Sequence, residues 1–128
     1  MDSISEMIAR IKNAFQVRKN EVIVPFSNLK EEIVKVLHQE GFLEGYKKIQ
    51  KKKKEFLVIS LKYKNNSPAI SEIRRVSKPG RRIYAGKKEI PKFNKGFGLL
   101  IISSPKGIIT DKKAKKIGIG GEIICHLY

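Results

Sequence analysis

The stretch IISSPKGIITDKKAKKIGIGGEIICHLY, residues 101–128, holds most of the signals that decide the fold. It begins inside a short apolar run, residues 99–102, with the length and composition of a buried strand. A turn of Ser, Ser, Pro, Lys and Gly follows at residues 103–107, and residues 108–110 form a second, very short strand candidate. The stretch therefore predicts two short strands joined by a tight turn.

A short helix and a last strand complete this stretch. Asp111 lies where a helix N-cap is expected, before a lysine-rich run, and Gly118 has the place of the C′ glycine. Residues 121–127 then return as a strand with Ile123 and Cys125 expected on one face. Glycines, hydroxyls and lysines together indicate small polar groups presented to an anion. A β-meander whose turns are merely polar is the alternative.

The charge of the chain is its strongest compositional signal. Its 128 residues include 28 Lys and Arg against 12 Asp and Glu, a net charge of +16. Residues 1–65 hold 14 basic and 8 acidic residues (+6), and residues 66–128 hold 14 basic and 4 acidic (+10). The 41% hydrophobic content suits a folded core. A folded domain this basic is expected to bind a polyanion, mainly through its C-terminal half.

An N-terminal helix is indicated by apolar residues that recur every three or four positions. The pattern predicts a helix over residues 4–18, with Arg10 and Asn13 away from its apolar side. These two side chains are either a solvated face or an RNA contact. A strand at residues 21–26 follows and ends near Pro25, which sheet edges and strand ends tolerate. The apolar stripe of the helix consists of Ile4, Ile8, Ile11 and Phe15.

A second helix is expected between Ser27, whose hydroxyl can cap its start, and Gly41, which suits its end. Lys30 lies in the first turn, where the helix dipole disfavours a cation, and so indicates an anion from outside the chain. The apolar stripe of this helix is expected to be Leu29, Ile33, Val36 and Leu37.

Residues 42–50 and 55–63 predict a hairpin around four consecutive lysines, residues 51–54. These lysines are expected to form a flexible, solvated tip that attracts anions in general. Residues 64–68, KNNSP, have the composition of a linker. We therefore place the boundary of two lobes there.

The N-terminal lobe is expected to cover residues 1–64, and a mainly β C-terminal lobe residues 69–128. Within the second lobe, residues 70–76 predict a strand that leads into a Pro-Gly turn. A short strand follows at residues 81–84, and residues 85–95 are irregular apart from one helical turn near residues 88–90. The predicted class is α+β: an α-β-α-β-β unit followed by an antiparallel β unit with a short helix.

The chain offers no residues for catalysis, a metal or a cofactor. Cys125 and His126 are neighbours in a strand and point to opposite faces, which prevents a catalytic dyad. Two histidines and one cysteine show no zinc-ligand spacing. The glycines at 118–121 follow a helix and precede a strand, the reverse of a dinucleotide fingerprint. The lone cysteine suits a reducing compartment, and no signal peptide or membrane span is expected.

Several polar residues suit RNA, which proteins bind through its shape, its phosphates and 2′-hydroxyls, and its unpaired bases. Ser103 and Ser104 offer hydroxyls on a tight turn, and Lys106 is placed for a phosphate. We expect Ser104 to contribute most. Tyr84, behind Arg81 and Arg82, can stack. Glu122 forms either an ion pair with the helix at residues 112–116 or a contact with a base or ribose.

The chain closely resembles small-subunit ribosomal protein eight of bacteria and plastids, over almost its whole length. The matching motifs are Ile11-Lys12-Asn13, Leu29-Lys30, Glu40-Gly41-Phe42, Arg75-Val76-Ser77-Lys78-Pro79-Gly80, Arg82-Ile83-Tyr84, Ser103-Ser104-Pro105-Lys106-Gly107, Thr110-Asp111 and Gly120-Gly121-Glu122-Ile123-Ile124-Cys125. The resemblance implies a two-lobed α+β protein. It also implies early binding of an irregular stem in the central domain of small-subunit ribosomal RNA and, in some bacteria, repression of its own operon's messenger RNA.

The resemblance also assigns residues to RNA binding. The residues that it matches to the family's contacts are Tyr84, Ser103, Ser104, Lys106, Gly120, Gly121 and Glu122, with a secondary contact at Arg10, Asn13 and Lys30. Gly107, Lys78 and Arg82, which lie within the matching motifs, complete the expected RNA-binding set. Pro105 departs from the small polar residue usual in this loop and loses a hydroxyl and an N–H. The expected partners are ribosomal RNA and neighbouring ribosomal proteins, in the ribosomes of the cytoplasm or a plastid stroma. A free-standing basic RNA regulator or chaperone is the alternative class.

Overall fold

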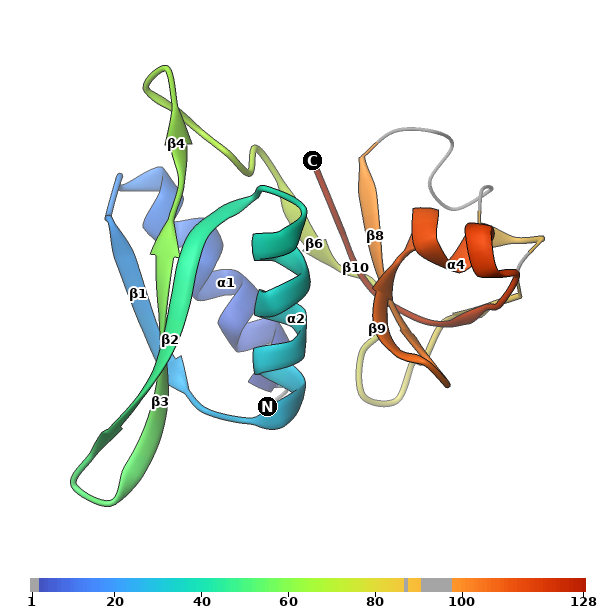
Figure 1. Cartoon of the computed structure of the whole chain (residues 1–128), viewed down its shortest axis with the longest axis horizontal. Helices are drawn as coiled ribbons and strands as arrows, with labels where there is room; N and C mark the ends of the chain where they lie inside the picture. Colours follow the sequence, from blue (N-terminus) through green and yellow to red (C-terminus); the bar gives the residue numbers. More distant parts are fainter. Residues whose placement is uncertain (1–2, 87, 91–97) are drawn as a thin grey trace. The chain divides into compact units, whose positions relative to one another are not determined.

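A computed structural model of the chain describes residues 3–86, 88–90 and 98–128 (Figure 1). Helices and antiparallel sheets are combined, which confirms the α+β class. The chain divides into two compact units, residues 3–71 and residues 72–128, and each has its own sheet. No helix in the described part of the chain is long and apolar enough to cross a membrane.

The first unit has the predicted α-β-α-β-β order. Its elements are α1 (Ser3–Gln16), β1 (Glu21–Pro25), α2 (Asn28–Gln39), β2 (Leu43–Lys51), β3 (Lys54–Leu61) and a small hairpin of β4 (Tyr63–Lys64) and β5 (Ser67–Pro68). The main sheet is antiparallel in the order β1-β3-β2. Helix α1 buries the apolar stripe that its spacing predicts, and α2 buries Ile33 and Leu37 of its predicted stripe but not Leu29 and Val36.

Helix α1 ends two residues earlier than predicted, at Gln16. Arg18 has a φ of 58°, and its N–H donates to the Phe15 carbonyl at 3.2 Å. The N–H of Lys19 donates to the Ala14 carbonyl at 2.9 Å. This is a Schellman ending with arginine in the position that glycine usually holds, so no glycine marks the end of this helix in the sequence.

Helix α2 confirms its predicted caps and corrects its predicted stripe. Ser27 Oγ accepts from the Lys30 N–H at 3.2 Å, and Gly41 has a φ of 85°. Leu29, however, is 39% exposed, whereas Lys30 is buried and its Nζ donates to the Pro25 carbonyl at 3.0 Å. The aliphatic stem of lysine can pack in a core when its ammonium finds an acceptor. The buried residues are Lys30, Ile33, Val34 and Leu37.

The β2–β3 hairpin has a shorter tip than predicted. Lys51 pairs with Lys54, so only Lys52 and Lys53 form the turn. Their φ angles of 51° and 67° belong to a two-residue turn of the I′ kind. The prediction of a flexible loop of four lysines is therefore wrong.

The segment expected as a linker is an ordered hairpin. Asn65 and Asn66, with φ of 52° and 65°, form the turn between β4 and β5. The Tyr63 hydroxyl donates to the Lys19 carbonyl at 2.6 Å, and the Arg18 guanidinium donates to the Asn66 carbonyl. These bonds fix the hairpin onto the first unit.

The second unit is mainly antiparallel β-structure. It contains β6 (Ile73–Arg75), β7 (Tyr84–Ala85), β8 (Leu99–Ser104), β9 (Gly107–Thr110), α4 (Asp111–Ile117) and β10 (Gly121–Leu127). Its strand order is β6-β10-β8-β9, with β7 also paired to β10. Gly86 O accepts from the N–H groups of Glu89 and Ile90, which confirms the helical turn near residues 88–90. The rest of the predicted irregular segment, residues 91–97, lies outside the described residues.

The start of α4 differs from the predicted N-cap. Thr110, not Asp111, is the N-cap, and its Oγ1 accepts from the Lys113 N–H at 3.1 Å. Asp111 is the first helical residue, and its buried Oδ1 accepts from the Leu100 N–H at 3.1 Å. Because the Asp111 carboxylate is hydrogen-bonded to strand β8, the neighbouring Thr110 caps the helix instead. Gly118, with a φ of 74°, ends α4 as predicted.

A β-bulge at Ile124 divides strand β10. Ile123 pairs with Ile102, and Cys125 pairs with Ile101, its neighbour in β8. Cys125 therefore lies on the face opposite Ile123, and the prediction that they share a face is wrong, because a bulge adds one residue to the alternation. On the Ile123 side lies a core cluster of Ala85, Ile90, Leu100, Ile102, Ile109, Ala114 and Ile123.

Candidate nucleic-acid interface

One row of cross-strand neighbours brings together residues from three predicted motifs. Glu122 in β10 pairs with Tyr84 in β7 on one side and with Ser103 in β8 on the other. Ser103 in turn pairs with Ile108 in β9. Directly paired residues in antiparallel strands share a face, here the face opposite the core cluster. We call Tyr84, Glu122, Ser103 and Ile108 the four-strand row.

Tyr84 is the exposed aromatic of this row. Its side chain is 68% exposed, the largest value among the exposed large hydrophobic residues that the structure describes. Its backbone is fixed by pairing with β10, so the ring is presented on an ordered strand. An exposed ring held in this way can stack on an unpaired base or pack against a ribose.

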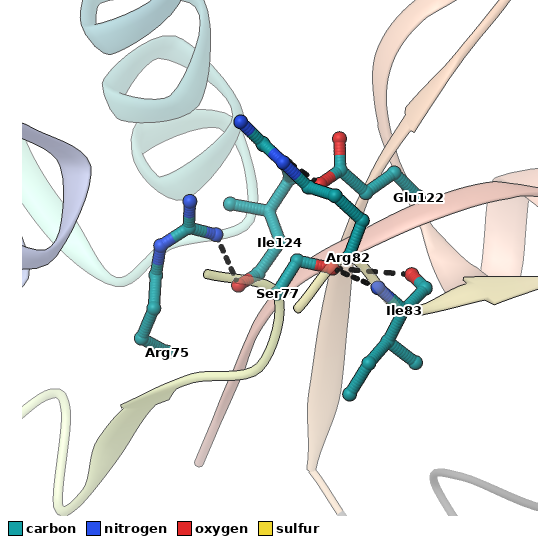
Figure 2. Close-up of polar contacts among 6 residues, drawn as sticks. All are labelled: Arg75, Ser77, Arg82, Ile83, Glu122 and Ile124. Carbon is teal, nitrogen blue, oxygen red and sulfur yellow. Dashed lines mark hydrogen bonds and ion pairs between the residues drawn. The ribbon is translucent and has the colours of Figure 1, made fainter. Parts of the chain in front are cut away.

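Glu122 forms an ion pair within this face. Its Oε2 lies 3.0 Å from Arg82 Nη1 (Figure 2), and its side chain is only 15% exposed. Of the two roles expected of Glu122, the ion pair with the lysines of α4 is therefore wrong. Ala114 of α4 belongs to the core cluster on the other face of the sheet, so α4 packs away from Glu122. The pair holds one end of the Arg82 guanidinium beside the row.

Ser77 positions this arginine and tyrosine, and sequence reasoning missed its role. The side chain is fully buried, and Oγ accepts from the Ile83 N–H at 2.9 Å and donates to the Ile83 carbonyl at 3.1 Å (Figure 2). Ile83 lies between Arg82 and Tyr84. A serine before a Pro-Gly turn carries no sequence signal for such a brace, because its partner is fixed only by the closed loop.

The loop between Ser77 and Ile83 is itself closed. The N–H of Lys78 donates to the Arg81 carbonyl at 3.0 Å, and the N–H of Arg81 donates to the Lys78 carbonyl at 2.9 Å. Gly80 has a φ of 81°, as a Pro-Gly turn requires, so this predicted turn is confirmed. The side chains of Lys78 and Arg81 are exposed and add positive charge beside Arg82.

The serine segment is more ordered than a loop. Ser103 and Ser104 are the last residues of β8, and Pro105 and Lys106 form the two-residue turn. Ser104 Oγ donates to the Gly107 carbonyl at 2.9 Å and accepts from the Lys106 N–H at 3.1 Å. Its hydroxyl is thus committed to the turn. The described residues provide no hydrogen-bond partner for the Ser103 hydroxyl, which makes Ser103 the freer group.

Gly120 and Gly121 allow close approach of neighbouring strands. A Cβ on Gly120 would lie closer than 3.0 Å to the Ala85 carbonyl oxygen, and one on Gly121 equally close to the Ser103 carbonyl oxygen. Both neighbours are backbone atoms and cannot rotate away. The two glycines therefore set the distance of β10 from β7 and β8, and through it the spacing of the row.

The predicted secondary residues lie in the first unit. Arg10 Nη1 donates to the Ile23 carbonyl at 2.9 Å, and Nη2 pairs with Glu6 at 3.1 Å. Arg10 and Asn13 line one groove between α1 and β1. Lys30 does not join them, since its buried ammonium is bonded to the Pro25 carbonyl.

The two units define a class of protein: a small, strongly basic α+β protein built of two lobes. Within the described residues, no group of three or more histidine, cysteine or carboxylate side chains is arranged to hold a metal ion.

Comparison with known proteins identifies the family. The model for ribosomal protein S8 matches residues 2–128 of the chain. The small ribosomal subunit protein uS8 of Thermus aquaticus is 46% identical and that of Kosmotoga olearia 48%, each over 99% of this chain and 98% of the relative. The protein of the same name from Dictyoglomus turgidum is 46% identical, over 99% of this chain and 97% of the relative. The chain belongs to the ribosomal protein S8 family, a family of structural proteins and not of enzymes.

Proposed function

We propose that the chain is a structural component of the small ribosomal subunit that binds small-subunit ribosomal RNA through its second unit. The observation that carries the proposal is the four-strand row, in which Tyr84, Glu122 and Ser103 share one face of an ordered sheet. The net charge of +16 and the membership of the S8 family support it. The RNA element that the resemblance implies is an irregular stem in the central domain, bound early in subunit assembly.

Groups of the row and the lysines of the neighbouring turns each suit part of an irregular stem. Lys106 and Lys78 are exposed point charges that fit phosphates. The Ser103 hydroxyl can donate to or accept from a 2′-hydroxyl or a base edge. The Tyr84 ring can stack where an internal loop leaves a base unpaired. A regular A-form duplex would offer no such base, so the row favours an irregular stem over a perfect one.

Sedimentation and footprinting test this function together. A ribosomal component is expected to travel with small subunits through a sucrose gradient at high salt, and to protect one irregular stem of the organism's own small-subunit RNA. A free-standing RNA regulator or chaperone would wash off the subunits at high salt, and that result would overturn the proposal. Protection scattered over many regular duplexes would contradict the role given to the row.

We further propose that the same surface binds the messenger RNA of the chain's own operon, where a segment imitates the ribosomal stem. A surface that recognises the shape of an irregular stem binds any RNA that adopts that shape. Competition between the ribosomal stem and the operon leader for one protein would support this activity. Simultaneous binding of both RNAs would contradict it.

The salt dependence of binding reports how many phosphates are contacted. If the second unit neutralises about five or six phosphates, log K is expected to fall with log salt at a slope of roughly −4 to −5, since each contact contributes about 0.7–0.9. Titrations of the ribosomal stem at several potassium chloride concentrations measure the slope. A slope near zero would show that the positive charge does not hold the RNA.

The two serines are expected to respond differently to alanine. Ser103→Ala removes a free hydroxyl at the contact and is expected to lower affinity for the ribosomal stem about tenfold, with stability within about 0.5 kcal/mol of the parent. Ser104→Ala removes both turn bonds and is expected to cost about 1 kcal/mol of stability. Denaturant unfolding and filter binding on both variants measure this. Equal affinities for Ser103→Ala and the parent would show that the row does not contact RNA.

A further inference from the structure

The tip of the β2–β3 hairpin extends beyond the rest of its sheet. Strand β1 pairs with β3 only between Phe56 and Ser60. The last pairs of the hairpin, Gln50 with Glu55 and Lys51 with Lys54, lie past the end of β1, and the turn follows them. Figure 1 shows this tip protruding at the lower left of the first unit. We call residues 51–54 the lysine tip.

The sequence of the lysine tip lowers the stability of the hairpin in two independent ways. Lys52 and Lys53 both have positive φ, a conformation that costs an L side chain about 1 kcal/mol and that Asn-Gly would adopt more readily. Lys51 and Lys54 are directly paired, and like charges opposite each other in a ladder are destabilising. A sequence selected only to close this hairpin would have neither lysines at positive φ nor two lysines paired across the strands. Such a cost at an exposed site points to function.

The charge of the lysine tip is not neutralised within the part of the chain that the structure describes. All four side chains are exposed. The nearest carboxylate along the strand, Glu55, is bonded to Lys48 at 3.0 Å, and Lys48 also lies 4.6 Å from the centre of the Phe26 ring. Glu55 thus neutralises Lys48 and not the tip. The tip presents four positive charges on four consecutive residues.

We propose that the lysine tip is a second RNA-binding element, which grips phosphates of small-subunit ribosomal RNA in addition to the contact of the four-strand row. This inference rests on the proposed function. Ammonium groups on aliphatic stems act as point charges that fit phosphates without reading sequence. A two-residue turn fixes the backbone beneath them, so less freedom is lost on binding than for a flexible loop. Phosphates between Lys51 and Lys54 also relieve the repulsion of the paired lysines.

The variant Lys52→Asn/Lys53→Gly tests the tip without damaging the hairpin. Asn-Gly suits the observed turn, so thermal stability is expected to stay equal or to rise. Affinity for the full-length small-subunit RNA transcript is expected to fall about tenfold, and the salt slope to shrink by roughly 1.4–1.8, as expected for two lost phosphate contacts. The control Lys35→Gln/Lys64→Gln removes the same charge from exposed positions of the same unit. It is expected to change affinity less than about threefold, because separated surface charges are screened.

Directed cleavage of the RNA supplies an independent measurement. Burial raises the pKa of the native Cys125 thiol to about 12, although the charge of Arg75 lowers it in part, so this thiol stays protonated and unreactive. An iron chelate can therefore be attached selectively at Lys53→Cys, at Pro105→Cys beside the row, or at the exposed control Glu32→Cys on α2. In complexes with the transcript, the Lys53 tether is expected to cleave a defined RNA segment well above the Glu32 tether.

The outcomes separate the two proposals. Cleavage from both Lys53 and Pro105, with the affinity loss in Lys52→Asn/Lys53→Gly, supports both. Cleavage from Pro105 alone, with parental affinity and salt slope in the tip variant, overturns the proposal that the lysine tip binds RNA and leaves the proposed function standing. An acidic protein would then be the partner to seek for the tip. No RNA binding by the parent chain overturns the proposed function and the inference that rests on it.

Discussion

Gly121→Ala is expected to destabilise the second unit by about 3 kcal/mol, the upper range for overpacking. The added Cβ would lie closer than 3.0 Å to the Ser103 carbonyl oxygen and carbon. Both atoms belong to the paired strand β8, so relief requires separating β8 from β10 rather than turning a side chain. Thermal and denaturant unfolding, followed by far-ultraviolet circular dichroism, measure the loss.

Gly45→Ala is the matched control for this prediction. The substitution is chemically identical, and a Cβ at Gly45 meets nothing within 4 Å. Its effect on the free energy of unfolding is expected to stay within about 0.5 kcal/mol. Parental stability in Gly121→Ala would mean that β8 and β10 approach each other less closely than the structure shows.

Glu122→Ala is expected to weaken binding of the ribosomal stem about tenfold or more, although it makes the protein more positive. A fully additive view of charge predicts tighter binding when a carboxylate is removed. Here the carboxylate lies 3.0 Å from Arg82 Nη1 and is mostly buried, so its loss removes the ion pair that ties the guanidinium to the four-strand row. Losing a preorganised charged contact costs about 1.5–3 kcal/mol. Affinity measured at fixed salt tests this.

Glu89→Ala provides the electrostatic control, since it removes an exposed carboxylate from the same unit. Its affinity for the stem is expected to equal or exceed that of the parent. Glu122→Gln keeps an acceptor oxygen and is expected to fall between the parent and Glu122→Ala. Binding by Glu122→Ala as tight as by Glu89→Ala would show that net charge alone governs the contact, and that the ion pair has no part in it.

Features governed by local chemistry were predictable from the sequence. The Ser27 cap, the Gly41 and Gly118 helix ends and the Pro-Gly turn each depend on residues within one turn of the chain. Features that depend on distant partners were not. Lys30 can be buried because the Pro25 carbonyl accepts a hydrogen bond from its ammonium. Thr110 caps α4 in place of Asp111, whose carboxylate accepts a hydrogen bond from the Leu100 N–H.

The candidate site divides in the same way. Its polar residues could be picked out from the sequence, because serines, glycines and an aromatic amid cations are visible there. Their roles could not, because the bonds join residues far apart: Arg82 and Glu122 are 40 positions apart in the chain. The hydroxyl of Ser104, expected to face a partner, closes its own turn, while the buried Ser77 braces Ile83.

The bulge at Ile124 changes how strand β10 tolerates substitution. In a regular strand with one buried face, every second position accepts a polar residue. Here Ile123, Ile124 and Cys125 are 0%, 3% and 0% exposed, so three successive codons must each specify a buried apolar side chain. Deleting Ile124 would restore regular alternation and leave Ile123 and Cys125 paired with Ile102 and Ile101, so the residues beyond it would keep their faces and only one buried apolar side chain would be lost. The bulge thus gives β10 one more buried apolar position than its pairing with β8 requires.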